Sequence, residues 1–299
     1  MGVKVAARIK NFDWLALALT VPFMVLISVF IVAPVALTIR NAFTSSTIIG
    51  LPGEYVGLKQ FDRVLHEQMF WDSLERSLYW VLGNALLQTL VAFFFALSVH
   101  QRLRGGALTQ ILILLPWTIP TVAIAVVGTW IFNSSYGIAN YVLREIGIID
   151  APINAFGNPN IALKSLVILQ SWHLFPFFFV VILGALKTVP HELYEAAAID
   201  GANAVQRFFK ITFPMISRII GIVGLIGTLW SFNVFDTIYL ITRGGPIDST
   251  FTAPLYVYNA AFREFQLGKS AAASVILMLI LIAFAVLYYR FAVRKAEVY

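Results

Sequence analysis

Residues 165–186 read SLVILQSWHLFPFFFVVILGAL, a stretch of 22 residues without a single Asp, Glu, Lys or Arg. A helix of about 20 apolar residues is long enough to cross the hydrocarbon core of a lipid bilayer. The stretch therefore predicts a membrane-spanning helix, and it sets the criterion by which the rest of the chain can be searched.

Five further runs meet nearly the same criterion, one of them with a single acid in it. They cover residues 14–39, 77–99, 105–132, 219–242 and 270–289. The run from residue 105 stays uncharged as far as Leu143, but the polar residues 133–137 indicate that its helix ends near Phe132. The first run is too long for the apolar region of a signal peptide and predicts a retained helix. The sequence thus predicts an all-α polytopic membrane protein with six transmembrane helices.

The composition of the whole chain agrees with this prediction. The chain is 60% hydrophobic and 12% charged, whereas soluble domains carry about 25% charged residues. This balance argues against a soluble enzyme or a nucleic-acid-binding protein, and the basic residues behind the net charge of +6 are scattered rather than clustered. The chain has no cysteine, and its four histidines show no metal-binding spacing. We therefore expect a lipid bilayer as its surroundings, with no metal site.

The distribution of basic residues predicts the orientation in the membrane. Six spans place both termini on the same side, and Lys and Arg are about twice as dense on that side as on the other. The positive-inside rule therefore places both termini in the cytoplasm. We expect a cytoplasmic N-terminus over residues 1–13, a six-helix transmembrane domain over residues 14–291 and a cytoplasmic tail over residues 292–299.

The loop between the fourth and fifth runs, residues 187–215, is too polar for the membrane interior. In its first half, Pro190 suits a helix start and Gly201 is a suitable helix stop. Asn203 is a good N-cap for a second short helix, which Pro214 is expected to end before the fifth span. Such a helix–turn–helix at the cytoplasmic surface could transmit force from a soluble partner. The alternative is an amphipathic unit that rests on the lipid surface.

The same loop carries a signature with several fixed positions. The segment Glu195-Ala196-Ala197, followed by Gly201 and by Pro214, fits the pattern EAA-x3-G-x9-I-x-LP, with Phe213 in place of the usual Leu. This pattern resembles the signature of permease subunits in binding-protein-dependent ATP-binding-cassette importers. The resemblance implies a type I importer transmembrane domain with a cytoplasmic coupling helix. The residues that the resemblance implies for coupling to the ATPase are Glu195, Ala196, Ala197, Asp200, Gly201 and Pro214.

A second resemblance lies at the outer end of the fifth run. Residues 240–250, Leu-Ile-Thr-Arg-Gly-Gly-Pro-Ile-Asp-Ser-Thr, are similar to the Thr-x-Gly-Gly-Pro segment of carbohydrate importers. That segment is typical of the first of two permease subunits in the maltose and glycerol-3-phosphate type. The resemblance therefore implies a carbohydrate or sugar-like polyol as the substrate, with this chain forming half of the translocation pathway.

The same resemblance implies a set of partners. These are a second homologous permease, an ATPase dimer and an extracytoplasmic solute-binding protein, assembled in the cytoplasmic (inner) membrane of a bacterium or archaeon. The chain contains no Walker A motif, so ATP and Mg²⁺ are expected on the separate ATPase. We therefore expect neither a cofactor nor a catalytic residue in this chain, which is a transporter subunit and not an enzyme.

Polar residues inside the spans are candidates for the substrate pathway, because such residues are costly in lipid and usually face the bundle interior. The candidates, joined by aromatic residues that could cover the C–H face of a sugar, are Asn84, Gln88, Gln170, Trp172, Trp230, Asn233 and Asp236. On a continuous helix Asn233 and Asp236 would share a face with Trp230. Alternatively, Asn84 and Gln88 bond between helices, and Asp236 pairs with Arg243.

Three other functions remain as alternatives. One is an importer of the same class for a non-sugar solute such as glycerol-3-phosphate or an amino acid. Another is a stand-alone secondary transporter, which would need intramembrane charges and an inverted repeat. The last is a membrane enzyme, which would need clustered Asp, Glu or His side chains. The sequence shows one acid inside the spans and no evident repeat or cluster, so it favours the importer.

Overall fold

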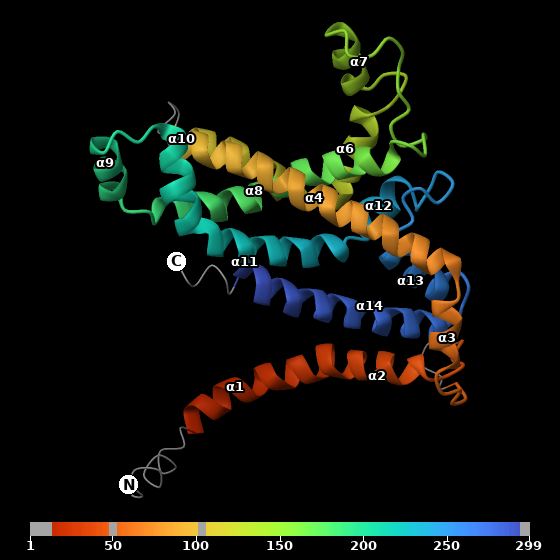
Figure 1. Ribbon diagram of the computed structural model, residues 1–299. Coiled ribbons are helices and arrows are strands. Elements are labelled where there is room, and N and C mark those ends of the chain that lie inside the picture. Colours follow the sequence, from red (N-terminus) through yellow and green to blue (C-terminus); the bar gives the residue numbers. More distant parts are fainter. Residues whose placement is uncertain (1–13, 48–52, 101–105, 294–299) are drawn as a thin grey trace, which may run out of the picture. The chain divides into compact units, whose positions relative to one another are not determined.

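The computed structural model describes residues 14–47, 53–100 and 106–293, so the expected N-terminal segment 1–13 and all but the first two residues of the expected tail 292–299 lie outside the described residues. Within the described ranges the regular secondary structure is helical, apart from one isolated bridge between Thr44 and Tyr55. The chain divides into two units, residues 1–66 with 260–276 and residues 67–259 with 277–299. Figure 1 labels the helices of both units.

The first unit holds the first candidate span. It consists of α1 (Trp14–Ile27), the π-helical turn η2 (Ser28–Val32), α2 (Ala33–Ala42), α3 (Lys59–Leu65) and parts of α13 and α14. Pro34 stands in the first turn of α2, directly after the π-helical turn, where a missing backbone N–H is tolerated. The chain therefore stays helical through this proline. After α2, the N–H of Val56 donates to the carbonyl of Phe43 at 2.8 Å.

The second unit holds the helix bundle and the loop with the signature. Its elements are α4 (Gln68–His100), α5 (Gly106–Thr118), α6 (Thr121–Ile131), α7 (Ile138–Glu145), α8 (Ala162–Lys187), α9 (His191–Ile199), α10 (Ala204–Arg207), η3 (Phe208–Thr212), α11 (Phe213–Phe232) and α12 (Asp236–Ile241). Helices α13 (Ala253–Phe262) and α14 (Leu267–Tyr288) contribute residues to both units, and η4 (Tyr289–Val293) follows α14.

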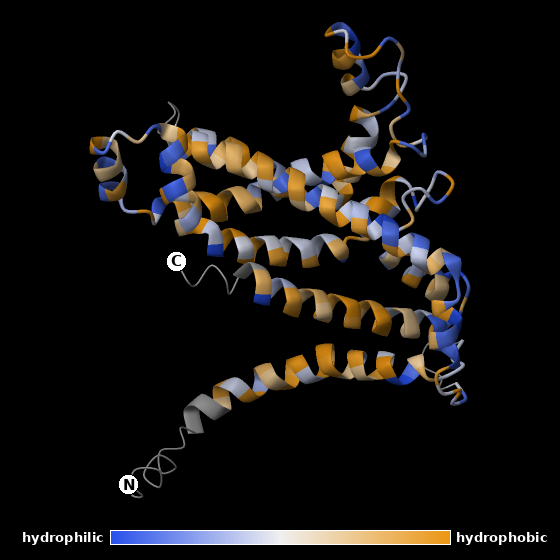
Figure 2. Cartoon of the chain, viewed as in Figure 1, coloured by the Kyte–Doolittle hydropathy of each residue, from blue (hydrophilic) through white to orange (hydrophobic). Residues whose placement is uncertain are grey.

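Helix α8 is the centre of the bundle. It packs against α4, α5 and α11, and 61% of its most apolar window is buried. Residues 165–186 therefore lie in the helix that the others surround. A core cluster on these four helices includes Ala92, Ile113, Phe179, Leu186 and Ile216. In Figure 2 the hydrophobic colour dominates α14, whereas polar colour appears on α9 and α10.

The structure agrees with the predicted all-α membrane fold. Among the described residues, five helices are long and apolar enough to cross a membrane, and the bent pair α5–α6 would supply a sixth span. Helix α4 begins nine residues before the predicted start at Ser77. The charged residues before Ser77 end the apolar run without ending the helix, because Glu and Arg are good helix formers.

The third span differs from the single helix predicted over residues 105–132. It breaks between Thr118 and Thr121, and the two parts are bent by 95°. Pro120 explains the break, because it has no backbone N–H and it disfavours the helical conformation of Ile119 before it.

The fifth span corrects two further predictions. Pro214 does not end the second loop helix, since η3 joins α10 to α11 without interruption and Pro214 lies in the first turn of α11. At the other end α11 stops at Phe232, whereas the prediction ran on to Thr242. Residues 233–235 are not helical and α12 starts at Asp236.

Candidate functional site: the coupling loop and the membrane polar residues

Helix α9 carries the Glu-Ala-Ala segment and ends as predicted at Gly201. The glycine has φ of +77°, which glycine adopts without the steric cost that other residues carry. The N–H of Ala202 donates to the carbonyl of Ala197 at 2.9 Å, and that of Gly201 donates to Ala198 at 3.1 Å. These two bonds form a Schellman motif that satisfies carbonyls at the helix end. At the other end, Pro190 is the N-cap rather than the first helical residue.

The second loop helix begins with a complete capping box, which confirms Asn203 as its N-cap. The N–H of Gln206 donates to Asn203 Oδ1 at 2.9 Å, and the N–H of Asn203 donates to Gln206 Oε1 at the same distance. Only four residues, 200–203, therefore separate two helices whose facing ends are both fixed by hydrogen bonds. The loop is built as a defined turn.

A side-chain bond ties this turn to the fifth span. The hydroxyls of Tyr194 on α9 and Thr212 on η3 hydrogen-bond at 2.8 Å, and Thr212 is buried. Both residues also line a cavity of about 600 Å³, together with His100, His191 and Arg207. Because η3 continues into α11, this bond connects α9 directly to the start of the fifth span.

The outer surface of α9 combines exposed acids, Glu192 and Glu195, with exposed apolar side chains. The side chain of Glu195 is 66% exposed and accepts a hydrogen bond from His191 Nδ1 at 3.1 Å. Ala196 and Asp200 are exposed as well, and Ile199 is 87% exposed. Exposed apolar residues rimmed by polar ones mark contact surfaces for proteins or membranes. The structure therefore presents the predicted coupling residues outward.

Three of the predicted pathway residues, Asn84, Gln88 and Gln170, are buried. Each is hydrogen-bonded to a residue of another helix or of the same helix. Asn84 Oδ1 accepts from Gln88 Nε2 and from the hydroxyl of Ser171 on α8, both at 3.2 Å. Gln170 Oε1 accepts from the hydroxyl of Thr237 at 2.8 Å. The Asn84–Ser171 bond joins α4 to α8, as the alternative expectation for Asn84 and Gln88 had it, whereas the bond of Gln88 to Asn84 stays within α4.

Trp230 lies in a different setting, at the surface of α11. It is 50% exposed, and its ring lies 4.8 Å from the ring of Phe177 on α8. Phe177 in turn lies 5.8 Å from Trp117 on α5. The three rings, called here the aromatic series, bring α5, α8 and α11 together at one surface. Phe177 was not among the predicted site residues, because nothing in its sequence position separates it from the phenylalanines beside it.

The remaining polar candidates lie at the break after α11. Asn233 is the C-cap of α11, and its side chain donates to the carbonyl of Leu229 at 2.8 Å. Asp236 is the first residue of α12, so the predicted shared helix face with Asn233 is wrong. Both are exposed, and among the described residues Asp236 makes no ion pair with Arg243. Asp236 instead lies within electrostatic reach of His173.

The segment Gly244-Gly245-Pro246 lies in a turn closed by backbone hydrogen bonds. Gly244 has φ of +94°, and a Cβ there would come within 2.6 Å of the Phe251 side chain. The hydroxyl of Thr250 donates to the carbonyl of Gly245 at 2.7 Å and lies 2.7 Å from the hydroxyl of Thr242. The segment is therefore held as a closed loop after α12.

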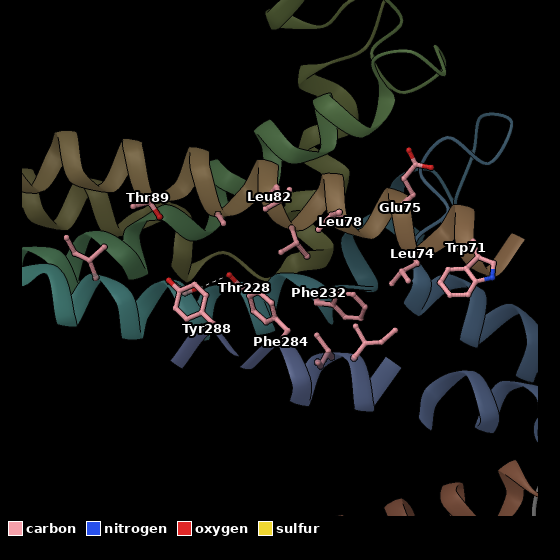
Figure 3. Close-up of a pocket in the computed structure, with 16 residues that line it drawn as sticks. Trp71, Leu74, Glu75, Leu78, Leu82, Thr89, Thr228, Phe232, Phe284 and Tyr288 are labelled. Carbon is pink, nitrogen blue, oxygen red and sulfur yellow. Dashed lines mark hydrogen bonds between the residues drawn. The ribbon is translucent and has the colours of Figure 1, made fainter. Parts of the chain in front are cut away.

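Two cavities of the bundle differ in character from the aromatic series. Trp172 lines one of about 560 Å³ between α4, α5 and α8, so it does not join Trp230. The other, of about 750 Å³, lies between α4, α11 and α14. Figure 3 shows Trp71 and Glu75 at one end of it and Thr89 and Tyr288 at the other. Its long apolar middle lacks the convergent polar groups of a sugar site.

Ionisable groups in the described ranges form no cluster of three or more His, Cys, Asp or Glu that could hold a metal. The segment Gly268-Lys269-Ser270 resembles the end of a phosphate-binding loop, but its polar groups bond to other parts of the protein. The ammonium of Lys269 pairs with Glu264 at 3.1 Å, and the N–H of Gly268 donates to the carbonyl of Ser46.

The chain matches one known protein family over most of its length. Residues 88–297 match the family described as the binding-protein-dependent transport system inner membrane component. The chain belongs to this family. It is therefore a multi-pass inner-membrane permease subunit of an ATP-binding-cassette importer, and it is not itself an enzyme.

Relatives of this permease have names that include a transported solute. The trehalose/maltose transport system permease protein MalF of Thermococcus litoralis is 31% identical over 89% of this chain and 90% of its own length. The sulfoquinovosyl glycerol transport system permease protein SmoG of Agrobacterium fabrum is 30% identical over 92% and 89%. The sn-glycerol-3-phosphate transport system permease protein UgpA of Yersinia pestis is 31% identical over 95% and 96%. The permease thus falls among carbohydrate-type relatives.

Solved structures share the fold of this permease. A crystal structure of a bacterial ABC transporter involved in the import of the acidic polysaccharide alginate matches with a TM-score of 0.79 and 20% identity, over 94% of this chain and 96% of that chain. The same kind of transporter in complex with an alginate pentasaccharide-bound periplasmic protein matches with a TM-score of 0.81, over 98% of each chain. The likeness confirms the fold.

Proposed function

We propose that this permease is the first of two homologous permease subunits in an importer for a carbohydrate or sugar-like polyol. In this proposal each permease forms half of the translocation pathway, and a solute-binding protein delivers the sugar to the outer face. Both termini lie in the cytoplasm, with residues 14–291 as the transmembrane domain and residues 187–215 as the coupling loop. The denser basic residues on that side support this orientation.

In this proposal α9 is the coupling helix, and it docks on the ATPase dimer through Glu195, Ala196, Ala197 and Asp200. The exposed acid and the apolar side chains beside it support this role, because a partner can bury them together. Gly201 fixes the end of α9, and Pro214 opens the helix that receives the displacement. ATP and Mg²⁺ remain on the ATPase.

The aromatic series is the observation that carries the carbohydrate class. Trp230, Phe177 and Trp117 present adjoining rings at one surface of the bundle, and a sugar ring packs its C–H face against such rings. Asn233, three residues after Trp230, and Asp236 are exposed and can bind hydroxyl groups. A mainly aromatic surface with a few polar groups is the pattern of small-molecule sites.

Reconstituted transport tests this proposal. The complete importer, with its ATPase, second permease and binding protein, is placed in liposomes, and uptake of the sugar bound by that binding protein is measured. We expect Trp230→Ala to lower uptake by about tenfold, the scale on which loss of one aromatic anchor acts. Trp130→Ala, which removes an exposed tryptophan of α6 outside the aromatic series, should leave uptake unchanged. Equal effects of the two changes would contradict the proposed sugar surface.

The same system separates the competing functions. This chain alone should move no solute, whereas uptake by the purified chain without ATP would indicate a secondary transporter. The second candidate substrate is a glycerol phosphate, which the relatives named for sn-glycerol-3-phosphate support. A thermal-shift screen of the cognate binding protein against neutral sugars and phosphate esters decides between the two.

A further inference from the structure

The third span has an elbow, residues 118–121, that joins two packing groups. Helix α5 before the elbow packs against α8, and helix α6 after it packs against α12. The two helices are bent by 95°. Helix α12 also contacts α8, so a movement of α6 and α12 relative to α5 would slide along α8 and pivot at the elbow.

The elbow leaves a backbone carbonyl that needs a donor. Pro120 has no N–H, and the helical bonding pattern is interrupted at Ile119. In apolar surroundings a freed carbonyl must be satisfied by another protein group. His173 on α8 supplies it, since its Nε2 lies 3.0 Å from the carbonyl oxygen of Ile119. His173 thus bonds the elbow itself to the central helix, whereas Gln170 on the same helix bonds Thr237 of α12.

The chemistry of this contact fixes the state of the ring. A carbonyl oxygen can only accept, so His173 Nε2 carries the hydrogen and donates it. In the neutral ring Nδ1 is then an acceptor, and it is buried without a hydrogen-bond partner in the part of the chain that the structure describes. Buried polar atoms are normally bonded, so each exception calls for an explanation. A histidine held only for packing would be expected to satisfy both nitrogens.

We propose that His173 is a positioning residue for transport, a latch that holds the elbow through its Nε2–H. The bond to Ile119 keeps α6 in its present direction from α5. The unbonded Nδ1 gives the ring a second bonding position when α6 and α12 move during the transport cycle. The latch thereby sets the balance between two conformations of the importer. It goes beyond the proposed function, because it holds for any transported solute.

Three substitutions separate the latch from packing. His173→Gln keeps a donor near the position of Nε2, because the glutamine amide reaches equally far from the backbone. His173→Asn places its amide near Nδ1 and cannot reach Ile119. His173→Leu fills the space without a donor. The latch predicts that the glutamine variant behaves like the natural protein, and that the asparagine and leucine variants behave alike.

Spin labels on either side of the elbow give a readout that packing alone would not change. The chain has no cysteine, so Leu108→Cys on α5 and Val126→Cys on α6, both at exposed positions, can be labelled specifically. The distance distribution is measured by pulsed electron paramagnetic resonance in the assembled importer in nanodiscs. We expect the asparagine and leucine variants to shift the ratio of the two conformations by about five- to tenfold, as loss of one hydrogen bond does.

ATP hydrolysis gives the second readout. The stimulation by the solute-binding protein should fall by a similar factor in the asparagine and leucine variants and stay unchanged in the glutamine variant. The proposal is overturned if the leucine variant keeps the natural distance distribution and stimulation. It is equally overturned if the glutamine variant loses both to the same extent as leucine. If the leucine variant does not assemble, the comparison of glutamine with asparagine decides.

Discussion

The hydroxyls of Tyr194 and Thr212 lie 2.8 Å apart, although 18 residues separate them in the chain. Tyr194 belongs to α9, which presents the exposed Glu-Ala-Ala segment, and Thr212 is buried at the end of η3. Since η3 continues into α11, the bond joins the helix that we propose to dock on the ATPase to the fifth membrane span. It gives the coupling loop a second attachment besides its backbone.

Tyr194→Phe removes this bond and leaves the aromatic ring. We expect membrane insertion and assembly to remain normal, whereas transport per ATP hydrolysed falls by about fivefold, the effect of about 1 kcal/mol. Uptake and phosphate release measured together in liposomes give the ratio. Tyr79→Phe, at an exposed position on α4, serves as the control. An unchanged ratio in the Tyr194 variant would show that the backbone connection is sufficient.

Glu195→Gln tests the proposed docking on the ATPase. The exposed contact with His191 contributes little to stability, so the melting temperature of the permease should stay the same. Loss of a charge that becomes buried against the ATPase should weaken assembly by about 2 kcal/mol or more. Co-purification of the ATPase at increasing salt measures this. Glu192→Gln, which removes an exposed acid from the first turn of the same helix, should have a smaller effect, and equal effects would contradict a specific role for Glu195.

Gly201→Ala tests the helix stop. The residue has φ of +77° and open space around the position of a Cβ, so the cost is conformational, about 1 kcal/mol. The end of α9 should therefore fray and coupled uptake should fall. Gly147→Ala is the matched control, because Gly147 has φ of +72° and equally open surroundings in another loop. Hydrogen exchange of the α9 amides should rise in the first variant alone.

Gly227→Ala tests the packing of α11 on α8. The glycine is buried, and a Cβ there would collide with the ring of Phe178. Overpacking of this kind costs about 1–3 kcal/mol, so the detergent-solubilised permease should unfold at a lower temperature. Gly184→Ala on α8, where a Cβ meets nothing within 4 Å, should be neutral or slightly stabilising. The same loss of stability in both variants would contradict the close approach.

Much of the coupling loop was predictable from residues close together in the chain. The stop at Gly201 and the cap at Asn203 depend on glycine conformational freedom and on a short side chain that bonds its own backbone. Pro214 shows the limit of such rules, since a proline was expected to end the helix. The chain accommodates it after a π-helical turn, an arrangement that involves bonds the sequence pattern does not reveal.

The membrane environment, the number of apolar runs and the Glu-Ala-Ala signature could all be predicted from the sequence. They depend only on local composition and on fixed spacing along the chain. Which polar residues are accessible, by contrast, depended on how the helices pack in the tertiary structure. Asn84, Gln88 and Gln170 are buried and bonded to residues far away in the chain or on the same helix. Phe177 belongs to the aromatic series because its ring contacts those of Trp117 and Trp230. The physical reason is that a side chain's exposure depends on the helices packed beside it, and its spacing in one helix does not specify them.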